Sequence, residues 1–188
     1  MIDGQMQITR SMLSKNYYYI RVEDLTKVYR KGSSSEMDPD DINTKIDVYE
    51  DRVGSWFLGV VNALREQNGA DFAMMQIAMA YIDGNQQLRE GKRTQDAFAR
   101  AMRRMFGLIS PDLLKSFQRQ VSSGLFHELV VSSSKVPIER GDYVAQIRVN
   151  PKKFVAETER DIRKYISELR NKKNGQLRKN FDRTFKLY

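Results

Sequence analysis

A long helical repeat of apolar residues constrains the fold of this chain more than any other feature. From Ile42 to Leu64 the apolar positions recur at steps of four and three residues. This spacing predicts a helix of about 24 residues with one broad apolar stripe. Pro39 and the aspartates beside it favour a helix start here, because they supply a cap and negative charge at the N-terminus. The stripe consists of Ile42, Ile46, Tyr49, Val53, Trp56, Phe57, Val60 and Leu64.

Three further helices are predicted after this one. Residues 71–91 are apolar nearly all round, which is typical of a helix packed between others, and Gly91 closes it. Thr94 caps a helix that extends to about Leu108, and Ser110 with Pro111 starts the next. The methionines and aromatic residues of these helices are interpreted as core filler rather than a cofactor pocket, since Met adapts to irregular gaps. We therefore expect no cofactor.

Beyond Val121 the helical spacing gives way to short β-type runs. The runs ELVVSS, VPIE and YVAQIRV, with a turn between the last two, predict a small antiparallel hairpin at about residues 129–150. Asn150 as cap and Pro151 at the first helical position then start a last long helix.

These segments predict a mainly α fold: a helical bundle with a small antiparallel β-hairpin before the last long helix. We expect a bundle domain over residues 42–170, an N-terminal arm and acidic loop over 1–41, and a basic aromatic tail over 171–188. In the arm, Tyr17–Val22 predicts a short strand or extended segment, and Asp24–Tyr29 predicts one or two helical turns.

Composition excludes several classes of function. The chain has no cysteine and one histidine, so cysteine-based sites and zinc sites with several imidazoles are excluded. No secretory signal and no apolar run of about 18 residues is present, so we expect a soluble cytoplasmic protein with no membrane partner. The acids Glu36, Asp38, Asp40 and Asp41 lack the central Gly and closing Glu of a calcium loop, so no metal site is expected.

The single histidine, His127, leaves one metal-free chemistry open. Histidine moves protons near neutral pH, and an arginine beside a scissile phosphate stabilises the transition state of RNA cleavage. Arg119 is the nearest upstream candidate, but it lies eight residues from His127. On a helix this spacing turns Arg119 about 80° away from the histidine.

Three stretches resemble HEPN-like helical proteins of bacteria. Trp56–Leu64 (WFLGVVNAL) resembles the helix that opens such domains, and Ala80–Lys92 (AYIDGNQQLREGK) resembles a helix whose acidic residue and Gly precede a polar turn. Ser122–Val131 (SSGLFHELVV) resembles the segment in which Arg, four residues and then His carry endoribonuclease activity. The resemblance covers about residues 42–170, and it implies self-association and a defence or mobile-element context.

The chain departs from the family pattern at Ser122. Aligning His127 with the family histidine places Ser122 where the resemblance implies the catalytic arginine, and serine supplies no charge to a phosphate. We therefore predict a non-catalytic interaction or regulatory domain, with a metal-independent endoribonuclease that uses His127 and Arg119 as the alternative. In the non-catalytic case a neutral His127 imidazole is predicted to pair with the Asp83 carboxylate, which otherwise lies in an apolar helix.

The last 18 residues carry most of the positive charge. Six cations and one acid in Asn171–Tyr188 give this segment a net charge of +5, against +8 for the whole chain. Basic and aromatic residues alternate there, as in segments that bind single-stranded nucleic acid, and RNA is the favoured partner. The alternative is a terminal helix that docks its phenylalanines on the bundle. The candidate binding residues are Lys172, Lys173, Arg178, Lys179, Phe181, Arg183, Phe185 and Lys186.

Overall fold

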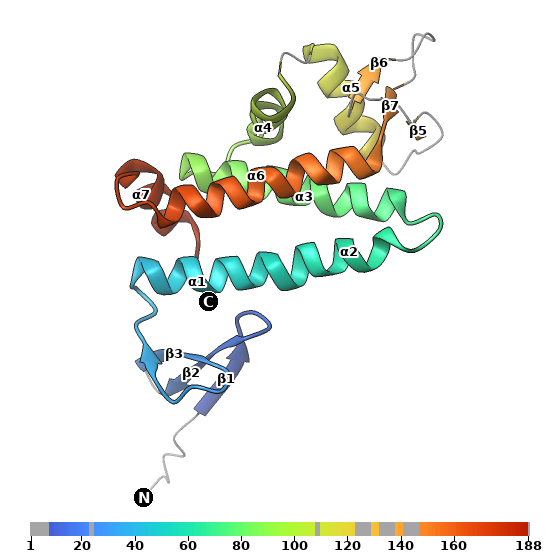
Figure 1. Cartoon of the computed structure of the whole chain (residues 1–188). Coiled ribbons are helices and arrows are strands. Elements are labelled where there is room, and N and C mark those ends of the chain that lie inside the picture. The colour runs from blue at the N-terminus through green and yellow to red at the C-terminus, as the bar shows by residue number, and fades with distance from the viewer. Residues whose placement is uncertain are drawn as a thin grey trace, which may run out of the picture.

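Two layers of long helices form the centre of the molecule (Figure 1). The computed structural model describes residues 8–22, 25–107, 110–122, 129–131, 138–140 and 147–187. The lower layer in Figure 1 is one continuous rod made of α1 (Ile42–Arg52), the π-helix η1 (Val53–Leu58) and α2 (Gly59–Arg65). The upper layer contains α3 (Asp71–Glu90) and α6 (Pro151–Arg170), which pack along one another. The predicted helix from Ile42 to Leu64 is confirmed, except for its π-helical middle.

Three predicted helix starts are confirmed by their caps. The predicted cap Thr94 is not, because α4 (Ala97–Phe106) begins three residues later with Asp96 in the cap position. The Asp41 carboxylate accepts a hydrogen bond from the backbone N–H of Asn43 at 3.3 Å, and the Asn150 side chain accepts from Lys153 N at 2.9 Å. Ser110 Oγ accepts from Leu113 N at 3.1 Å at the start of α5 (Pro111–Ser122). Each of these bonds satisfies a donor that the first turn of a helix leaves free.

Helix α4 (Ala97–Phe106) packs on α3 and leads to α5 and a second small sheet. This sheet contains β5 (Leu129–Val131), β6 (Ile138–Arg140) and β7 (Ile147–Val149), in the order β5-β7-β6. Strands β6 and β7 are antiparallel, as the predicted hairpin requires, whereas β5 pairs parallel to β7. The hairpin prediction is therefore confirmed in part, because a mixed three-stranded sheet occupies its place.

The N-terminal region contains a four-stranded antiparallel sheet. Its strands β1 (Ile8–Met12), β2 (Tyr17–Val22), β3 (Leu25–Arg30) and β4 (Glu36–Met37) are neighbours in chain order. The helical interpretation of Asp24–Tyr29 is wrong for its described part, residues 25–29, which lies within strand β3. The reason is cross-strand pairing: Tyr29 lies opposite Tyr18 with the two rings stacked at 5.5 Å, and Val28 is buried.

The sheet is attached to the helical rod through Asp51 of α1. Its carboxylate accepts hydrogen bonds from Ser14 Oγ at 2.5 Å, Asn16 N at 2.8 Å and Asn16 Nδ2 at 2.6 Å. Leu13, in the same loop between β1 and β2, is buried in the core. The described residues between Ile8 and Met37 therefore form a folded sheet, and the loop between β1 and β2 contributes Leu13 to the core.

Helix α7 (Gly175–Thr184) closes one end of the bundle (Figure 1). Phe181, Phe185 and Leu187 are buried, and the ring of Tyr49 in α1 lies 5.4 Å from the rings of both phenylalanines. The methionines of α3 and α4 also lie in the core, as predicted: Met74, Met75, Met79 and Met102.

Candidate functional site

The predicted catalytic pair lies mostly outside the described part of the chain. His127 falls in residues 123–128, which the structure does not describe. Arg119 and Ser122 belong to α5, whose described backbone ends at Ser122, but their side chains are also outside the description. Pairing of His127 with Arg119 therefore stays a prediction.

Asp83 has a described partner on its own helix. Gln87 Nε2 donates to Asp83 Oδ2 at 2.7 Å, one turn further along α3. The Asp83 carboxylate is half-buried, and the side-chain amide of Gln87 satisfies part of its hydrogen-bonding capacity. The Asp83–His127 pair stays a prediction, since His127 lies outside the described residues.

The aromatic and basic residues of the C-terminal segment separate into two groups. Phe181 and Phe185 lie in the core, where their rings stack on each other at 4.9 Å, so these rings are not available to stack on bases. Arg178 is half-buried and donates to the Leu169 carbonyl at 2.5 Å and to Asn43 Oδ1 at 3.2 Å. The other predicted cations are exposed: Lys172, Lys173, Lys179, Arg183 and Lys186.

The solvent-facing side of α6 carries a second set of cations that the sequence analysis missed. At about 100° per residue along the helix, the six cations of this set fall within about 120° of the helix circumference. The same stripe contains Ala156 and Ser167 but no acid. A helical wheel of residues 151–170 could have revealed it. The α6 stripe consists of the exposed residues Lys152, Lys153, Arg160, Arg163, Lys164 and Arg170.

The acids of α6 lie along the two flanks of this stripe and are paired with cations. On one flank Glu159 accepts from Arg65 of α2 at 2.8 Å. On the other flank Glu168 accepts from Arg89 of α3 at 2.7 Å. Three cations of the stripe are also ion-paired: Arg160 with Glu157, Lys164 with Glu168, and Arg170 with Asp47 and Glu50 of α1. Lys152 and Arg163 form no ion pair with any described residue.

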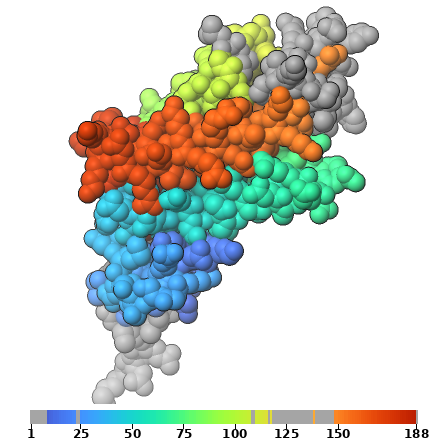
Figure 2. Space-filling model, in the orientation of Figure 1, coloured from blue at the N-terminus to red at the C-terminus, as the bar shows by residue number. Residues whose placement is uncertain are grey.

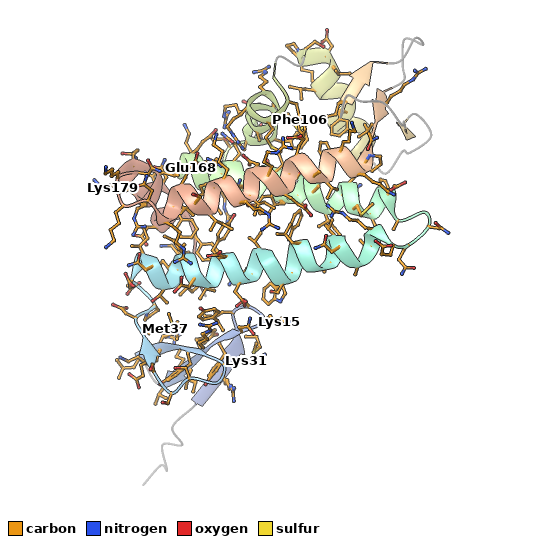
Figure 3. The ribbon with its side chains drawn as sticks, in the orientation of Figure 1. Lys15, Lys31, Met37, Phe106, Glu168 and Lys179 are labelled. Atoms are coloured by element: carbon orange, nitrogen blue, oxygen red, sulfur yellow. The ribbon has the colours of Figure 1, made fainter. Side chains whose placement is uncertain are left out.

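The α6 stripe and α7 form one surface. Figure 2 shows α6 and α7, coloured orange to red, as a continuous band across the face of the molecule. Residues 151–187 contain twelve Lys or Arg and five Asp or Glu, a net charge of +7. In Figure 3, Lys179 lies on α7, whereas Lys15 and Lys31 lie by the N-terminal sheet on the other side of α1.

A charged cleft of about 350 Å³ adjoins this surface between α3, α4 and α6. Arg160 and Lys164 of the α6 stripe line it together with Arg89 and Arg104. At its base the buried carboxylate of Asp161 is bound by both guanidinium nitrogens of Arg104, one of them at 2.9 Å. Arg89 also reaches Asp161, at 3.4 Å. Glu157 and Glu168 also line the cleft and pair with Arg160 and with Arg89 and Lys164, so its positive and negative charges are largely balanced.

A hydrogen-bonded chain extends from Asp161 into the bundle. Asn85 Nδ2 donates to Asp161 Oδ2 at 3.0 Å, and the hydroxyls of Tyr49 and Tyr81 lie 2.7 Å apart beside Asn85. Burial raises the pKa of both tyrosines well above the ordinary value, so they stay protonated at neutral pH. These hydroxyls serve as fixed hydrogen-bond donors rather than as acid–base groups.

Within the described ranges, no group of three or more His, Cys, Asp or Glu residues is arranged to hold a metal ion. No helix in the described part of the chain combines the length and apolar character needed to cross a membrane. Comparison with protein-family models, curated proteins and solved structures finds no match to this chain.

Proposed function

We propose that this protein is a non-catalytic, HEPN-like binding module that recognises nucleic acid, RNA in preference to DNA. The α6 stripe and the exposed cations of residues 172–186 form the binding surface. The preference for RNA and the lack of cleavage rest on the resemblance of residues 42–170 to HEPN-like proteins and on Ser122 in place of the family arginine. Self-association of the module is part of the same proposal.

The observation that supports the proposal is the stripe of six exposed cations on α6, in which Lys152 and Arg163 form no ion pair with any described residue. From Lys152 to Arg170 the helix rises about 27 Å, so the cations can contact several phosphates in succession. Each contact releases counterions from the nucleic acid, which gives sequence-independent affinity that falls with salt. Because Phe181 and Phe185 are buried, the surface binds through phosphates rather than through base stacking.

A matched pair of double variants tests this surface. Lys152→Ala with Arg163→Ala removes two exposed cations from α6, and Lys15→Ala with Lys31→Ala removes the same charge from the N-terminal sheet. Fluorescence anisotropy with a labelled single-stranded RNA measures affinity across a salt series. We expect the α6 variant to weaken binding about tenfold and to reduce the salt slope by about 1.4, the value for two lost contacts to a single strand. The sheet variant should bind as the wild type does.

Equal losses in the two variants, or no RNA binding by the wild type at low salt, would contradict the proposed surface. Tighter binding of an acidic peptide than of RNA would assign the surface to a protein partner instead. The same samples, incubated with RNA and EDTA, test the endoribonuclease alternative. Cleavage that disappears in His127→Ala would show that the protein is an enzyme.

A further inference from the structure

A pocket of about 390 Å³ lies beside the π-helix. Its walls come from η1 and α3, where the facing rings of Phe57 and Tyr81 have centroids 4.8 Å apart. Trp56 lines the pocket with 51% of its surface exposed. Gly84 of α3 contributes no side chain, and a Cβ at this position would meet nothing within 4 Å. The pocket is therefore an open, mainly apolar slot of small-molecule size, and four aromatic side chains line it.

Arg52 brings a positive charge to this slot without a carboxylate to balance it. Its Nε donates to the Leu13 carbonyl at 2.9 Å, and its guanidinium lies 5.5 Å from the Trp56 ring and 5.1 Å from the Phe185 ring. Across the ranges that the structure covers, no acid forms an ion pair with it. Burial lowers the pKa of Arg52, and no neighbouring charge is a cause of the change. A partly buried cation without an anion costs free energy, so this guanidinium is suited to bind an anionic ligand.

Two more polar groups reach the same slot without protein partners. Arg93 lines the pocket, is exposed, and forms no ion pair with any described residue. Thr184 Oγ1 is buried at the pocket wall and has no hydrogen-bond partner among the residues described. Asp51, which precedes Arg52 in the chain, is engaged by Ser14 and Asn16. The lining thus has two cations, a free hydroxyl and no acid.

We propose that this pocket binds a small planar aromatic carboxylate. The ring system lies between Trp56, Phe57 and Tyr81, and the carboxylate accepts hydrogen bonds from Arg52, with Arg93 adding charge at the rim. Flat rings suit a slot walled by aromatic side chains. A carboxylate matches the planar donors of a guanidinium, which bind its two oxygens side by side. This site is independent of the nucleic-acid surface on α6.

The chain provides its own probe, because Trp56 is its only tryptophan. Titration with 2-naphthoate should change the Trp56 fluorescence in a saturable way, and the neutral analogue 2-naphthalenemethanol should bind at least about tenfold more weakly, since it lacks the charge-assisted hydrogen bonds. Cyclohexanecarboxylate, an anion without a flat ring, should also bind more weakly. Equal affinity for the acid and the alcohol would overturn the proposal, and so would no binding of 2-naphthoate.

Substitutions in the pocket locate the site. Arg93→Gln removes an exposed charge with no described structural partner and should weaken 2-naphthoate several-fold, whereas Arg103→Gln on α4 should leave it unchanged. Arg52→Lys keeps the charge but loses the paired donors, and should weaken binding more than Arg93→Gln does.

Gly84→Leu should fill the slot and abolish binding while far-ultraviolet circular dichroism and the melting temperature show a folded chain. Retained affinity in folded Gly84→Leu, or equal affinities in Arg93→Gln and Arg103→Gln, would overturn the assignment. RNA affinity should be unchanged in all of these variants, so failure of this proposal and failure of the nucleic-acid proposal are distinguishable.

Discussion

Asp161 is the residue on which the polar contacts of the bundle converge. Its carboxylate accepts from Asn85 of α3 and from Arg104 of α4, and so it joins three helices through one buried anion. Arg89 contributes a further, longer contact. A buried carboxylate is costly unless it is paired, and here the pairing is complete enough to fix how α3, α4 and α6 are aligned.

Replacing Asp161 with asparagine should therefore destabilise the fold strongly. The change keeps the shape but leaves the buried side of Arg104 without its anion, for an expected loss of roughly 3 kcal/mol in the free energy of unfolding. Urea denaturation measures this. The control is Glu157→Gln, which removes an exposed pair with Arg160 and should change stability by less than about 0.5 kcal/mol. A loss in Asp161→Asn as small as in the control would contradict the structural role of Asp161.

Two glycines, one within α3 and one at its C-terminal cap, should respond to alanine in opposite directions. Gly84 is exposed in the middle of the helix with open space around its Cα, so Gly84→Ala should stabilise the protein by up to about 1 kcal/mol through helix propensity. Gly91 has φ +68°, and a Cβ there would lie 2.9 Å from Asn180 Cα. Gly91→Ala should therefore destabilise by at least about 1 kcal/mol. Thermal unfolding of the two variants checks the signs, and equal signs would contradict this description.

At the scale of elements, the N-terminal sheet depends on a small polar contact with α1. The Asp51 carboxylate accepts three hydrogen bonds from Ser14 and Asn16 in the loop between β1 and β2. Burial by itself would raise the pKa of Asp51, but the hydrogen bonds from Ser14 and Asn16 outweigh it and the pKa is lowered. The ionised carboxylate is thus the form that holds the sheet on the rod.

The stability given by Asp51 should be lost in acid. Because the folded-state pKa is lowered, the contribution is full above the ordinary aspartate range and disappears as the pH falls through the lowered value. The stability difference between wild type and Asp51→Asn should therefore shrink from about pH 6 to about pH 3 in urea unfolding. Ser14→Ala, which removes one of the three hydrogen bonds, should show an intermediate pH dependence. A difference that does not change with pH would contradict this origin of the attachment.

At the scale of the whole molecule, α7 is both the end of the bundle and part of its basic surface. Phe181, Phe185 and Leu187 complete the core under α1, while Lys179 and Arg183 on the same helix remain exposed. Docking of the tail, one of the two alternatives drawn from the sequence, is confirmed for the phenylalanines. Nucleic-acid binding by the cations stays a prediction.

Removal of the Phe181 ring should separate these two roles. Phe181→Ala should lower the free energy of unfolding by about 3 to 5 kcal/mol, since the ring is fully buried. Lys179→Ala, on the exposed side of the same helix, should change stability by less than about 0.5 kcal/mol. Denaturant unfolding gives both values, and similar values for the two variants would show that α7 does not form part of the core.

The sequence by itself determined the helices, because the signals for a helix lie within a few residues of one another. The stripe from Ile42 to Leu64, the caps at Asp41 and Asn150 and the stop at Gly91 could all be recognised from local spacing and residue type. The cations of the tail were also visible as composition.

The strands and the pairing of the charged side chains were decided by the tertiary structure alone, because they depend on contacts between residues that are distant in the chain. Leu25–Arg30 became a strand through pairing with β2, and β5 joined β7 in parallel across a gap in sequence. Glu159 and Glu168 of α6 pair with Arg65 and Arg89, whereas Arg52 lies against aromatic rings rather than a carboxylate. Arg170 of the stripe pairs with Asp47 and Glu50 of α1. Local periodicity states which side of a helix is polar, but only packing decides which charges are neutralised and which remain available to a partner.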